Sequence, residues 1–369
     1  MQHILTLTTY DVYNYGASLQ AYALQQYLIN QGHKSELINY QPAYLRRRYD
    51  YKWVNPESAL SKFWITRIAY RILKYIQRQT TMGRKKAFDK FHEQLLNQTE
   101  PFYTYEELAD NPPIGDLYIV GSDQIWNTFY ETGRDGAFYL DFVKQGVKAS
   151  YSASFSYTKI SKEWKEQITI WLKDFKQIAV REYHGVDILR SMGYEGIWVL
   201  DPVFLLPIKK WKEIMVPIKN IEPYILVYDF EKNKEIERFC KEYAKKMGLK
   251  IYSINDTYPK LYANKNFSSA GPADFLTLIY NCSAFVSNSF HGTAFSIMFN
   301  KPVFVFNRKR HKVNSRMESL TKMFGIEDCI VPEGFCIDKY TEMDFDFNHI
   351  NNIYAKELKK STDYLNLIL

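Results

Sequence analysis

Short apolar runs alternate with longer amphipathic stretches along most of the chain. In the first forty residues, apolar runs at 3–7 and 35–40 flank a stretch of helical periodicity at 17–30, which ends at Gly32. Short apolar runs bounded by turn residues are typical of strands, and the longer periodic stretch is typical of a helix. The order strand, helix, strand predicts the first unit of a parallel sheet.

The same alternation continues to the end of the chain, with one interruption. Residues 205–223 are rich in proline and lysine, as is typical of a connection between domains. Before it, strands are predicted at 116–120, 147–153, 177–180 and 197–200, with helices at 164–176 and 184–192. After it, strands are predicted at 224–228, 250–254, 284–287 and 302–306, with helices at 232–246, 273–281 and 293–299.

This pattern predicts an α/β fold with two Rossmann-like, doubly wound domains that face a cleft. We expect an N-terminal domain at 1–205, with a basic helical insertion at about 42–100, and a C-terminal domain at 220–345. The remaining residues, 346–369, are expected to form a long helix, and its return to the first domain is a hypothesis. Ligands of such sheets bind beyond the carboxyl ends of the strands, so polar residues at those positions are the candidates for a site.

Composition narrows the function classes. With 46% apolar and 17% aromatic residues, disorder is excluded as the main state. The net charge of +7 is local, because residues 41–90 hold thirteen Lys or Arg and three acids, which argues against a uniformly basic nucleic-acid-binding protein. Four scattered cysteines without paired spacing predict no structural metal, and the absence of a signal-peptide pattern predicts a cytoplasmic protein.

The basic insertion contains an amphipathic helical pattern. Arg67, Arg71, Lys74 and Arg78 recur at helical spacing, and an apolar stripe recurs every four residues at Trp64, Ile68, Ile72 and Ile76. One interpretation is an interfacial helix that rests on an anionic membrane surface, which would make the protein peripheral at the inner face of the membrane. The other is an ordinary helix whose stripe packs on the core, and general experience with amphipathic helices favours it.

The stretch 287–293, SNSFHGT, is the most informative candidate for chemistry. It follows an apolar strand and opens an apolar helix, which places His291 in the turn beside the N–H groups of a helix N-terminus. Such N–H groups favour a bound anion, and a histidine there is suited to proton transfer. Ser289, Gly292 and Thr293 are the neighbouring candidates for anion binding. The alternative is a structural histidine that caps its own turn.

Four further strand ends carry polar side chains. The stretch 121–127, GSDQIWN, offers groups that could hydrogen-bond a sugar and a tryptophan ring on which it could stack; an Asx turn that caps the next helix is the alternative. The candidates there are Ser122, Asp123, Gln124, Trp126 and Asn127.

The first strand–helix turn lacks the GxGxxG pattern, which argues against NAD and FAD. It contributes Asn14, Tyr15, Gly16 and Gln20 as further candidate binding residues, with Asn14 also suited to capping the helix. Arg181 follows a further strand, and Arg308 and Arg310 follow the strand after the histidine helix, together with His311 and Arg316. These cations suit an anion clamp, with a surface ion pair and a solvated loop as the alternatives.

These motifs, taken in order, resemble the polysaccharide pyruvyl transferase family. The resemblance is carried by Asn14-Tyr15-Gly16, GSDQIWN, Val180-Arg181-Glu182, Asp201-Pro202-Val203 and the stretch SNSFHGTAFSIMFNKPVFVF. It implies a glycosyltransferase-B-like fold and the transfer of a pyruvyl group from phosphoenolpyruvate to a sugar as a cyclic ketal, with no cofactor.

The resemblance also implies roles for particular residues. His291 matches the catalytic histidine, and Arg181 resembles the arginine that helps to hold the donor. One branch of the family has an arginine two positions before the histidine, where this chain has Ser289, so we expect Arg308 or Arg310 to supply that cation. The implied acceptor is a lipid-linked, galactose-containing sugar in the synthesis of a bacterial capsule or exopolysaccharide. A nucleotide-sugar glycosyltransferase and a non-catalytic glycan-binding protein are the alternatives.

Overall fold

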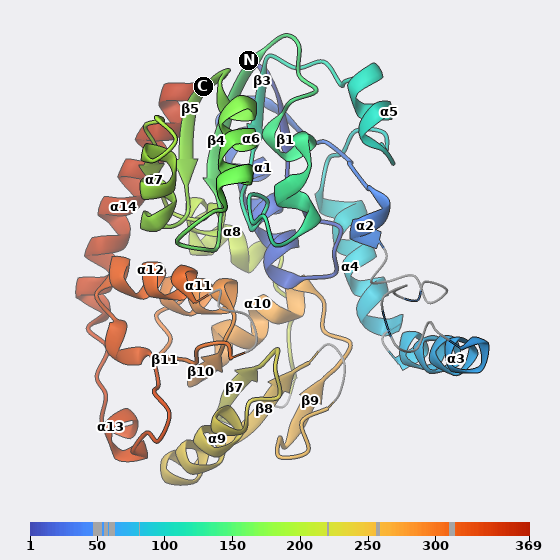
Figure 1. Ribbon diagram of the computed structural model, residues 1–369. Coiled ribbons are helices and arrows are strands. Elements are labelled where there is room, and N and C mark those ends of the chain that lie inside the picture. The colour runs from blue at the N-terminus through green and yellow to red at the C-terminus, as the bar shows by residue number, and fades with distance from the viewer. Residues whose placement is uncertain are drawn as a thin grey trace.

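Two parallel β-sheets form the framework of the protein (Figure 1). The computed structural model describes residues 1–46, 54, 58, 63–80, 82–219, 221–255, 259–309 and 314–369. The first sheet has six strands in the order β2-β1-β3-β4-β5-β6, and the second has five in the order β11-β10-β7-β8-β9. The fold is therefore α/β with two parallel-sheet domains, as predicted.

The strands of the first sheet are β1 (His3–Leu7), β2 (Lys34–Leu37), β3 (Leu117–Val120), β4 (Val147–Ala153), β5 (Phe175–Val180) and β6 (Ile197–Trp198). Those of the second sheet are β7 (Tyr224–Tyr228), β8 (Lys250–Ile254), β9 (Lys265–Phe267), β10 (Ala284–Ser287) and β11 (Val303–Val305). Each predicted strand is present within a few residues. The additional strand, β9, is short and polar, and it lies at an edge of its sheet.

The helices that connect the strands follow the predicted alternation. They are α1 (Tyr15–Asn30), α2 (Ala43–Arg46), α3 (Trp64–Thr80), α4 (Met82–Leu95), α5 (Tyr105–Asp110), α6 (Lys162–Leu172), α7 (Tyr183–Arg190), α8 (Ile208–Glu213), α9 (Lys234–Met247), α10 (Pro272–Asn281), α11 (Phe290–Met298), α12 (Ser315–Phe324), α13 (Ile337–Thr341) and α14 (Phe347–Ile368). Among the described residues, no helix is long and apolar enough to cross a membrane.

The first sheet is buried on both faces. Ile4 belongs to one apolar cluster, whereas its neighbour Leu5 belongs to another, and Ile119 and Val120 divide in the same way. Because successive side chains of a strand point to opposite faces, each face of this sheet must be covered. The cluster that contains Ile4 continues through the second sheet, so the two domains share one apolar core.

Two helices join the domains. At the N-terminus of α1, the Tyr15 ring stacks on Phe275 of α10 with 4.6 Å between ring centroids, and its hydroxyl donates to the Ala270 carbonyl oxygen. The long helix α14 follows the second domain in sequence and runs along the side of the first (Figure 1). There its Ser361 hydroxyl accepts a hydrogen bond from the Leu200 N–H. The two domains are therefore held together by packing at the N-terminus of α1 and along α14.

Helix α3 does not pack on the core, contrary to the interpretation favoured above. It projects from the body of the protein beyond α4 (Figure 1). Trp64 is 70% exposed and Ile72 is 54% exposed, although both belong to the predicted apolar stripe. The side chains of Lys74, Ile76 and Arg78 lie outside the described residues.

Candidate active site between the domains

His291 lies on the first turn of α11, directly beyond the carboxyl end of β10. The helix begins at Phe290, earlier than the sequence pattern predicted, because the Ser289 hydroxyl caps it by accepting from the Gly292 N–H at 3.3 Å. The side chain of His291 therefore leaves the second domain at its strand ends and points toward the first domain.

The imidazole of His291 lies between the two domains and is 6% exposed. On one side it lies so close to Gly16 of α1 that a Cβ atom there would lie 1.9 Å from Nδ1. On the other side, Nε2 lies 3.5 Å from Oδ2 of Asp201. Nε2 is buried and has no hydrogen-bond partner among the described residues, because its contact with Asp201 is an ion-pair distance without hydrogen-bond geometry. Glycine is thus required at position 16 for the ring to occupy this place.

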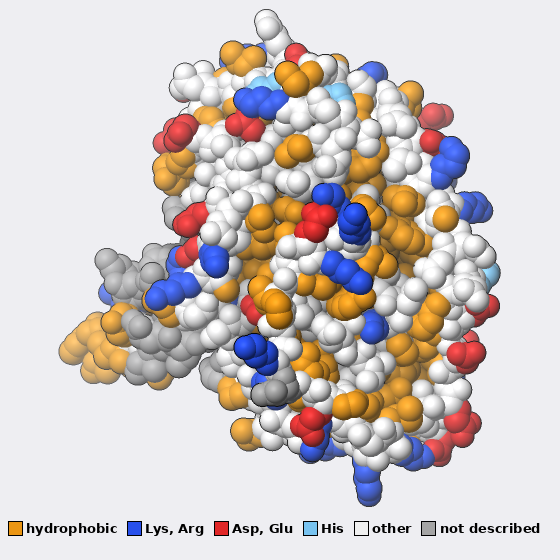
Figure 2. Space-filling view, turned by 180° about the vertical axis from the view of Figure 1, so that it is seen from behind, with side chains coloured by type: hydrophobic (Ala, Val, Ile, Leu, Met, Phe, Trp, Pro, Cys, Tyr) orange, Lys and Arg blue, Asp and Glu red, His pale blue; other side chains and the backbone are white. Residues whose placement is uncertain are grey.

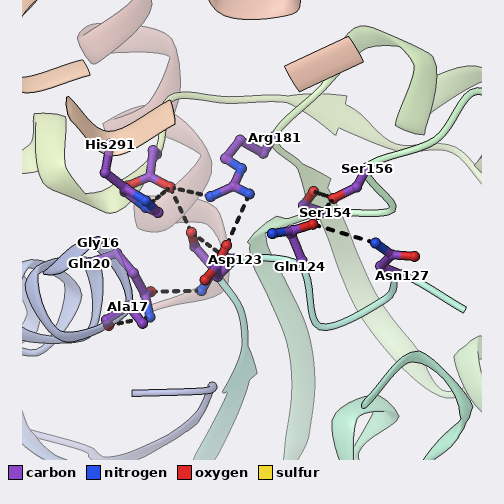
Figure 3. A network of polar contacts seen from close by, with 12 residues as sticks. Gly16, Ala17, Gln20, Asp123, Gln124, Asn127, Ser154, Ser156, Arg181 and His291 are labelled. Atoms are coloured by element: carbon purple, nitrogen blue, oxygen red, sulfur yellow. Dashed lines mark hydrogen bonds and ion pairs between the residues drawn. The ribbon is translucent and has the colours of Figure 1, made fainter. Parts of the chain in front are cut away.

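Asp201 is the centre of a buried polar network at the end of β6 (Figure 3). Its Oδ2 accepts hydrogen bonds from the Ser122 hydroxyl at 2.7 Å and from Nη1 of Arg181 at 2.9 Å. Burial opposes ionisation of this carboxyl, but His291 and Arg181 outweigh it and hold the pKa of Asp201 well below its usual range. Asp201 is therefore a permanent negative charge beside the imidazole. The sequence pattern placed it at a strand end but did not select it as a site residue.

Arg181 is surrounded by carboxylates. Besides Asp201, its guanidinium lies 3.3 Å from Oδ1 of Asp123 and 3.5 Å from Oε1 of Glu182, and it covers the ring of Phe290. Burial opposes the charge of Arg181, but Asp123 and Asp201 raise its pKa above the ordinary value. Since its donors face protein carboxylates, the arrangement suits a residue that organises the network. The guanidinium of Arg181 is thus directed at these carboxylates, whereas the resemblance led us to expect a direct contact with the donor.

Arg316 of α12 lies near this network and has no partner for its Nε among the described residues. It is 7% exposed, and burial together with the positive charge of Arg181 lowers its pKa to about 10. Arg308 also acts electrostatically on Arg316, and its own Nε lies 3.3 Å from Glu231. The expected cation Arg310 lies outside the described residues. Asp123 and Glu182 attract the charge of Arg316, but a buried donor without a partner is costly, so its Nε is a candidate to bind an anion.

The N–H groups of Gly292 and Thr293 do not face an anion as expected. That of Gly292 donates to the Ser289 hydroxyl, and that of Thr293 donates to the Ser289 carbonyl oxygen. The Thr293 hydroxyl donates to the same carbonyl oxygen at 3.0 Å. These residues and Ser289 therefore complete the cap of α11, and their binding of the donor stays a prediction.

The loop 121–127 contributes to the site in a different way from the one predicted. Trp126 is fully buried: its ring stacks on Tyr139, and its indole N–H donates to the Phe138 carbonyl oxygen. The expectation that this ring contacts a sugar is therefore wrong. Asn127 is also fully buried. Gln124 remains partly exposed and accepts a hydrogen bond from the Ser156 hydroxyl at 3.1 Å.

An exposed aromatic pair beside this loop was not predicted. The ring of Phe129 is 65% exposed and stacks on Tyr157 with 4.3 Å between centroids. Burial raises the pKa of the Tyr157 hydroxyl, and the positive charge of Arg316 opposes this, so the pair lies within electrostatic reach of Arg316. An aromatic residue two positions beyond Asn127 was visible in the sequence, but its exposure depends on the fold.

The first strand–helix turn supplies a wall of the site. Asn14 caps α1 by accepting from the N–H groups of Gly16 and Ala17, while Tyr15 is buried at the domain joint. Gln20 is fully buried; its side chain donates to the Thr8 hydroxyl and accepts from the Ser122 N–H at 3.1 Å. These residues hold α1 and the loop 121–127 in register and thereby position Gly16 against His291.

The chain was compared with known proteins at the level of sequence and of structure. The sequence model of the family described as polysaccharide pyruvyl transferase matches residues 14–310. A search of curated sequences found no match.

Among solved structures, a UDP-N-acetylglucosamine 2-epimerase from Listeria monocytogenes is similar at 9% identity, with 97% of this chain and 90% of that chain covered and a TM-score of 0.50. A UDP-N-acetylglucosamine 2-epimerase from Rickettsia bellii has 13% identity, 100% and 98% coverage and a TM-score of 0.48. The first likeness concerns the fold alone and agrees with a glycosyltransferase-B-like arrangement.

Proposed function

The chain belongs to the polysaccharide pyruvyl transferase family, and we propose that it transfers the pyruvyl group of phosphoenolpyruvate to two hydroxyls of one sugar, forming a cyclic ketal. The observation that carries this proposal is the position of the His291 ring. The ring lies between the domains, against Gly16 and Asp201, and all three residues belong to the segment that matches the family. The remaining charged groups around it suit an anionic donor and a sugar acceptor.

The proposed reaction balances without an oxidant or a metal. The first sugar hydroxyl adds to C2 of phosphoenolpyruvate as a proton reaches the methylene carbon, which becomes the methyl group. The C2–O bond to phosphate then breaks, and the second hydroxyl adds to C2. The two hydroxyl protons end on the methyl carbon and on the released phosphate. One group that first gives and then receives a proton is therefore sufficient.

The pair His291 and Asp201 is suited to that proton transfer. Oδ2 of Asp201 lies 3.5 Å from Nε2 of the imidazole, so the carboxylate holds one ring nitrogen and leaves the other for the substrates. We assign Nδ1 as the nitrogen that exchanges a proton with the substrates. Because the ring is largely enclosed, the domains must separate slightly to admit the substrates, and closure then excludes water, which competes with the sugar hydroxyls.

Arg316 and Arg308 are proposed to bind the carboxylate and phosphate of the donor. The Nε of Arg316 is buried and has no partner in the part of the chain that the structure describes, and Arg308, in the loop after β11, acts on Arg316 electrostatically. Arg181 is proposed to hold Asp123 and Asp201 in place, which makes it a positioning residue. A low-polarity site strengthens such fixed charges toward a developing anion.

The acceptor sugar is proposed to stack on the Phe129–Tyr157 pair, with Gln124 and Asp123 as hydrogen-bonding neighbours. An aromatic face beside polar groups is the usual surface for a sugar ring. We propose that this sugar belongs to a lipid-linked intermediate of a bacterial surface polysaccharide, such as a capsule or exopolysaccharide.

The experiment is a coupled assay of purified protein with phosphoenolpyruvate and a panel of acceptor glycans. Phosphate release must accompany a gain in glycan mass of one pyruvate less one water, and His291→Ala must show neither while unfolding cooperatively like the wild type. Arg316→Gln is expected to raise KM for phosphoenolpyruvate about tenfold or more. Arg190→Gln, an exposed arginine on α7, is the matched control and should leave KM unchanged.

Two outcomes would contradict the proposal. Full activity of folded His291→Ala would remove the assigned proton-transfer group. Transfer of a sugar from a nucleotide-sugar, with phosphoenolpyruvate left unchanged, would instead indicate a glycosyltransferase on the same fold.

A further inference from the structure

We infer that α3 is a docking helix that rests on a lipid surface bearing negative charge. The helix Trp64–Thr80 projects from the protein beside α4 and has few contacts with the rest of the described chain (Figure 1). It has two features of an interfacial helix, a largely exposed apolar face and a concentration of positive charge.

The apolar face of α3 is large and open. Trp64, Ile65 and Leu73 are each more than 60% exposed, and Ile68 and Ile72 are about half exposed. Figure 2 shows these hydrophobic side chains gathered at the outer end of the projection. Single exposed apolar residues are normal, but a contiguous set of large ones marks an interaction surface.

The charge of α3 selects the kind of surface. The segment 64–80 contains four Lys or Arg and no Asp or Glu, within the wider stretch 41–90 that holds thirteen basic residues and three acids. On a helix of 3.6 residues per turn, the four basic positions fall within an arc of about 60°, beside the apolar face. Arg67 and Arg71 are exposed. Basic residues that flank an apolar face match anionic lipid headgroups over acyl chains.

The same charge argues against a second copy of the chain as the occupant. A symmetric dimer pairs the same patch with itself, so two α3 helices would bring two arcs of like charge close together, and the segment 64–80 contains no acid. The aromatic side chains Trp64 and Tyr75 are half exposed or more, and amphipathic rings of this kind favour the level of lipid headgroups.

The docking helix is attached directly to the wall of the active site. Helix α4 follows α3, and its Arg84 donates to the Tyr13 carbonyl oxygen at 2.7 Å and to the Tyr15 hydroxyl at 3.2 Å. Tyr15 precedes Gly16, which faces His291. Helix α4 therefore links the docking helix to the strand–helix turn that packs against His291. This deepens, and rests on, the proposed function, because it accounts for how a lipid-linked acceptor reaches the enzyme.

The test is sedimentation of the full chain with vesicles of phosphatidylcholine, alone or with about 30% phosphatidylglycerol, at low and high salt. We expect binding to the anionic vesicles only, weakened by salt. Each basic residue near such a surface contributes about fivefold, so R67Q/R71Q should lower the partition coefficient about 30-fold. Ile68→Ser with Ile72→Ser should lower it at least about tenfold. The matched control K209Q/K359Q removes two exposed charges elsewhere and should have little effect.

Equal recovery with neutral and anionic vesicles, or unchanged binding by both α3 variants, would overturn the inference. So would a concentration-dependent dimer that the isoleucine variant abolishes in a protein that does not bind vesicles. The readouts separate this inference from the proposed function: R67Q/R71Q should turn over a water-soluble acceptor at the wild-type rate. His291→Ala should lose turnover and keep vesicle binding. Failure of one therefore leaves the other standing.

Discussion

Replacing Gly16 with alanine tests whether the position of the His291 ring is essential. The new Cβ would lie 1.9 Å from Nδ1 and 2.3 Å from Cγ of His291, whereas ordinary contacts begin at 3.4 Å. The ring must therefore retreat by about 1.5 Å, or the domains must separate by a similar distance. A displacement of about 1 Å costs an oriented reaction about 100-fold, so kcat/KM should fall at least 100-fold, or about 2.7 kcal/mol.

Stability should respond far less than activity. Alanine in a helix is favoured over glycine by about 1 kcal/mol, and overpacking costs about 1–3 kcal/mol, so the free energy of unfolding should fall by about 1 kcal/mol. The measurements are phosphate release with phosphoenolpyruvate and acceptor, and urea unfolding. Gly136→Ala is the matched control, because its Cβ would meet Asp141 at 3.3 Å, away from His291. Wild-type turnover by Gly16→Ala would refute the reasoning.

Three further predictions concern the network and the loop beside it. Asp201→Asn should lower kcat by about 10²–10⁴-fold with little change in KM for the donor, because it removes the charge that orients His291; an unchanged kcat in steady-state assays would contradict this. Because the pKa of Asp201 is depressed, its ionised form stabilises the fold above about pH 4, and this contribution is lost as the pH falls further. The free energy of unfolding in urea should therefore differ between wild type and Asp201→Asn by about 3 kcal/mol near neutral pH, and this difference should become smaller in acid. A difference that does not change with pH would argue against this reasoning. Trp126→Phe should lower the free energy of unfolding by about 1–3 kcal/mol and leave KM for the acceptor unchanged, whereas Phe129→Ala should raise that KM; the reverse pattern in acceptor titrations would restore Trp126 as the sugar contact.

The strands could be predicted because they are continuous apolar runs between turn residues. Strand β7, Tyr224–Tyr228, is wholly buried and apolar, and its pattern leaves no alternative assignment. Strand β9, Lys265–Phe267, has three residues and only one apolar side chain, so pairing with β8 alone defines it. The start of α11 was placed too late, because Gly292 suggested a turn although Ser289 is a favourable cap three residues earlier.

The site could be predicted only as far as strand ends define it. His291, Arg181 and Asp201 all follow strands, and parallel strands bring such residues to one edge. Which of them meet depends on the packing of the two domains, which no local pattern encodes. Trp126 and Arg316 illustrate this limit. Residues distant in sequence bury the Trp126 ring, and residues distant in sequence also enclose the Arg316 Nε, which has no partner among the described residues. The amphipathic pattern of α3 is likewise compatible with packing on the core and with binding to a surface, and only the fold distinguishes the two.

The most direct test of the account follows the fate of the donor's methylene carbon. Phosphoenolpyruvate labelled with ¹³C is incubated with the protein and an acceptor glycan in D₂O, and the products are followed by NMR together with released phosphate. We expect one ketal carbon per phosphate, a ketal methyl group that carries a single deuterium, and no ketal with folded His291→Ala. Phosphate release without a ketal by the wild type, or ketal formation at the wild-type rate by His291→Ala, would contradict it.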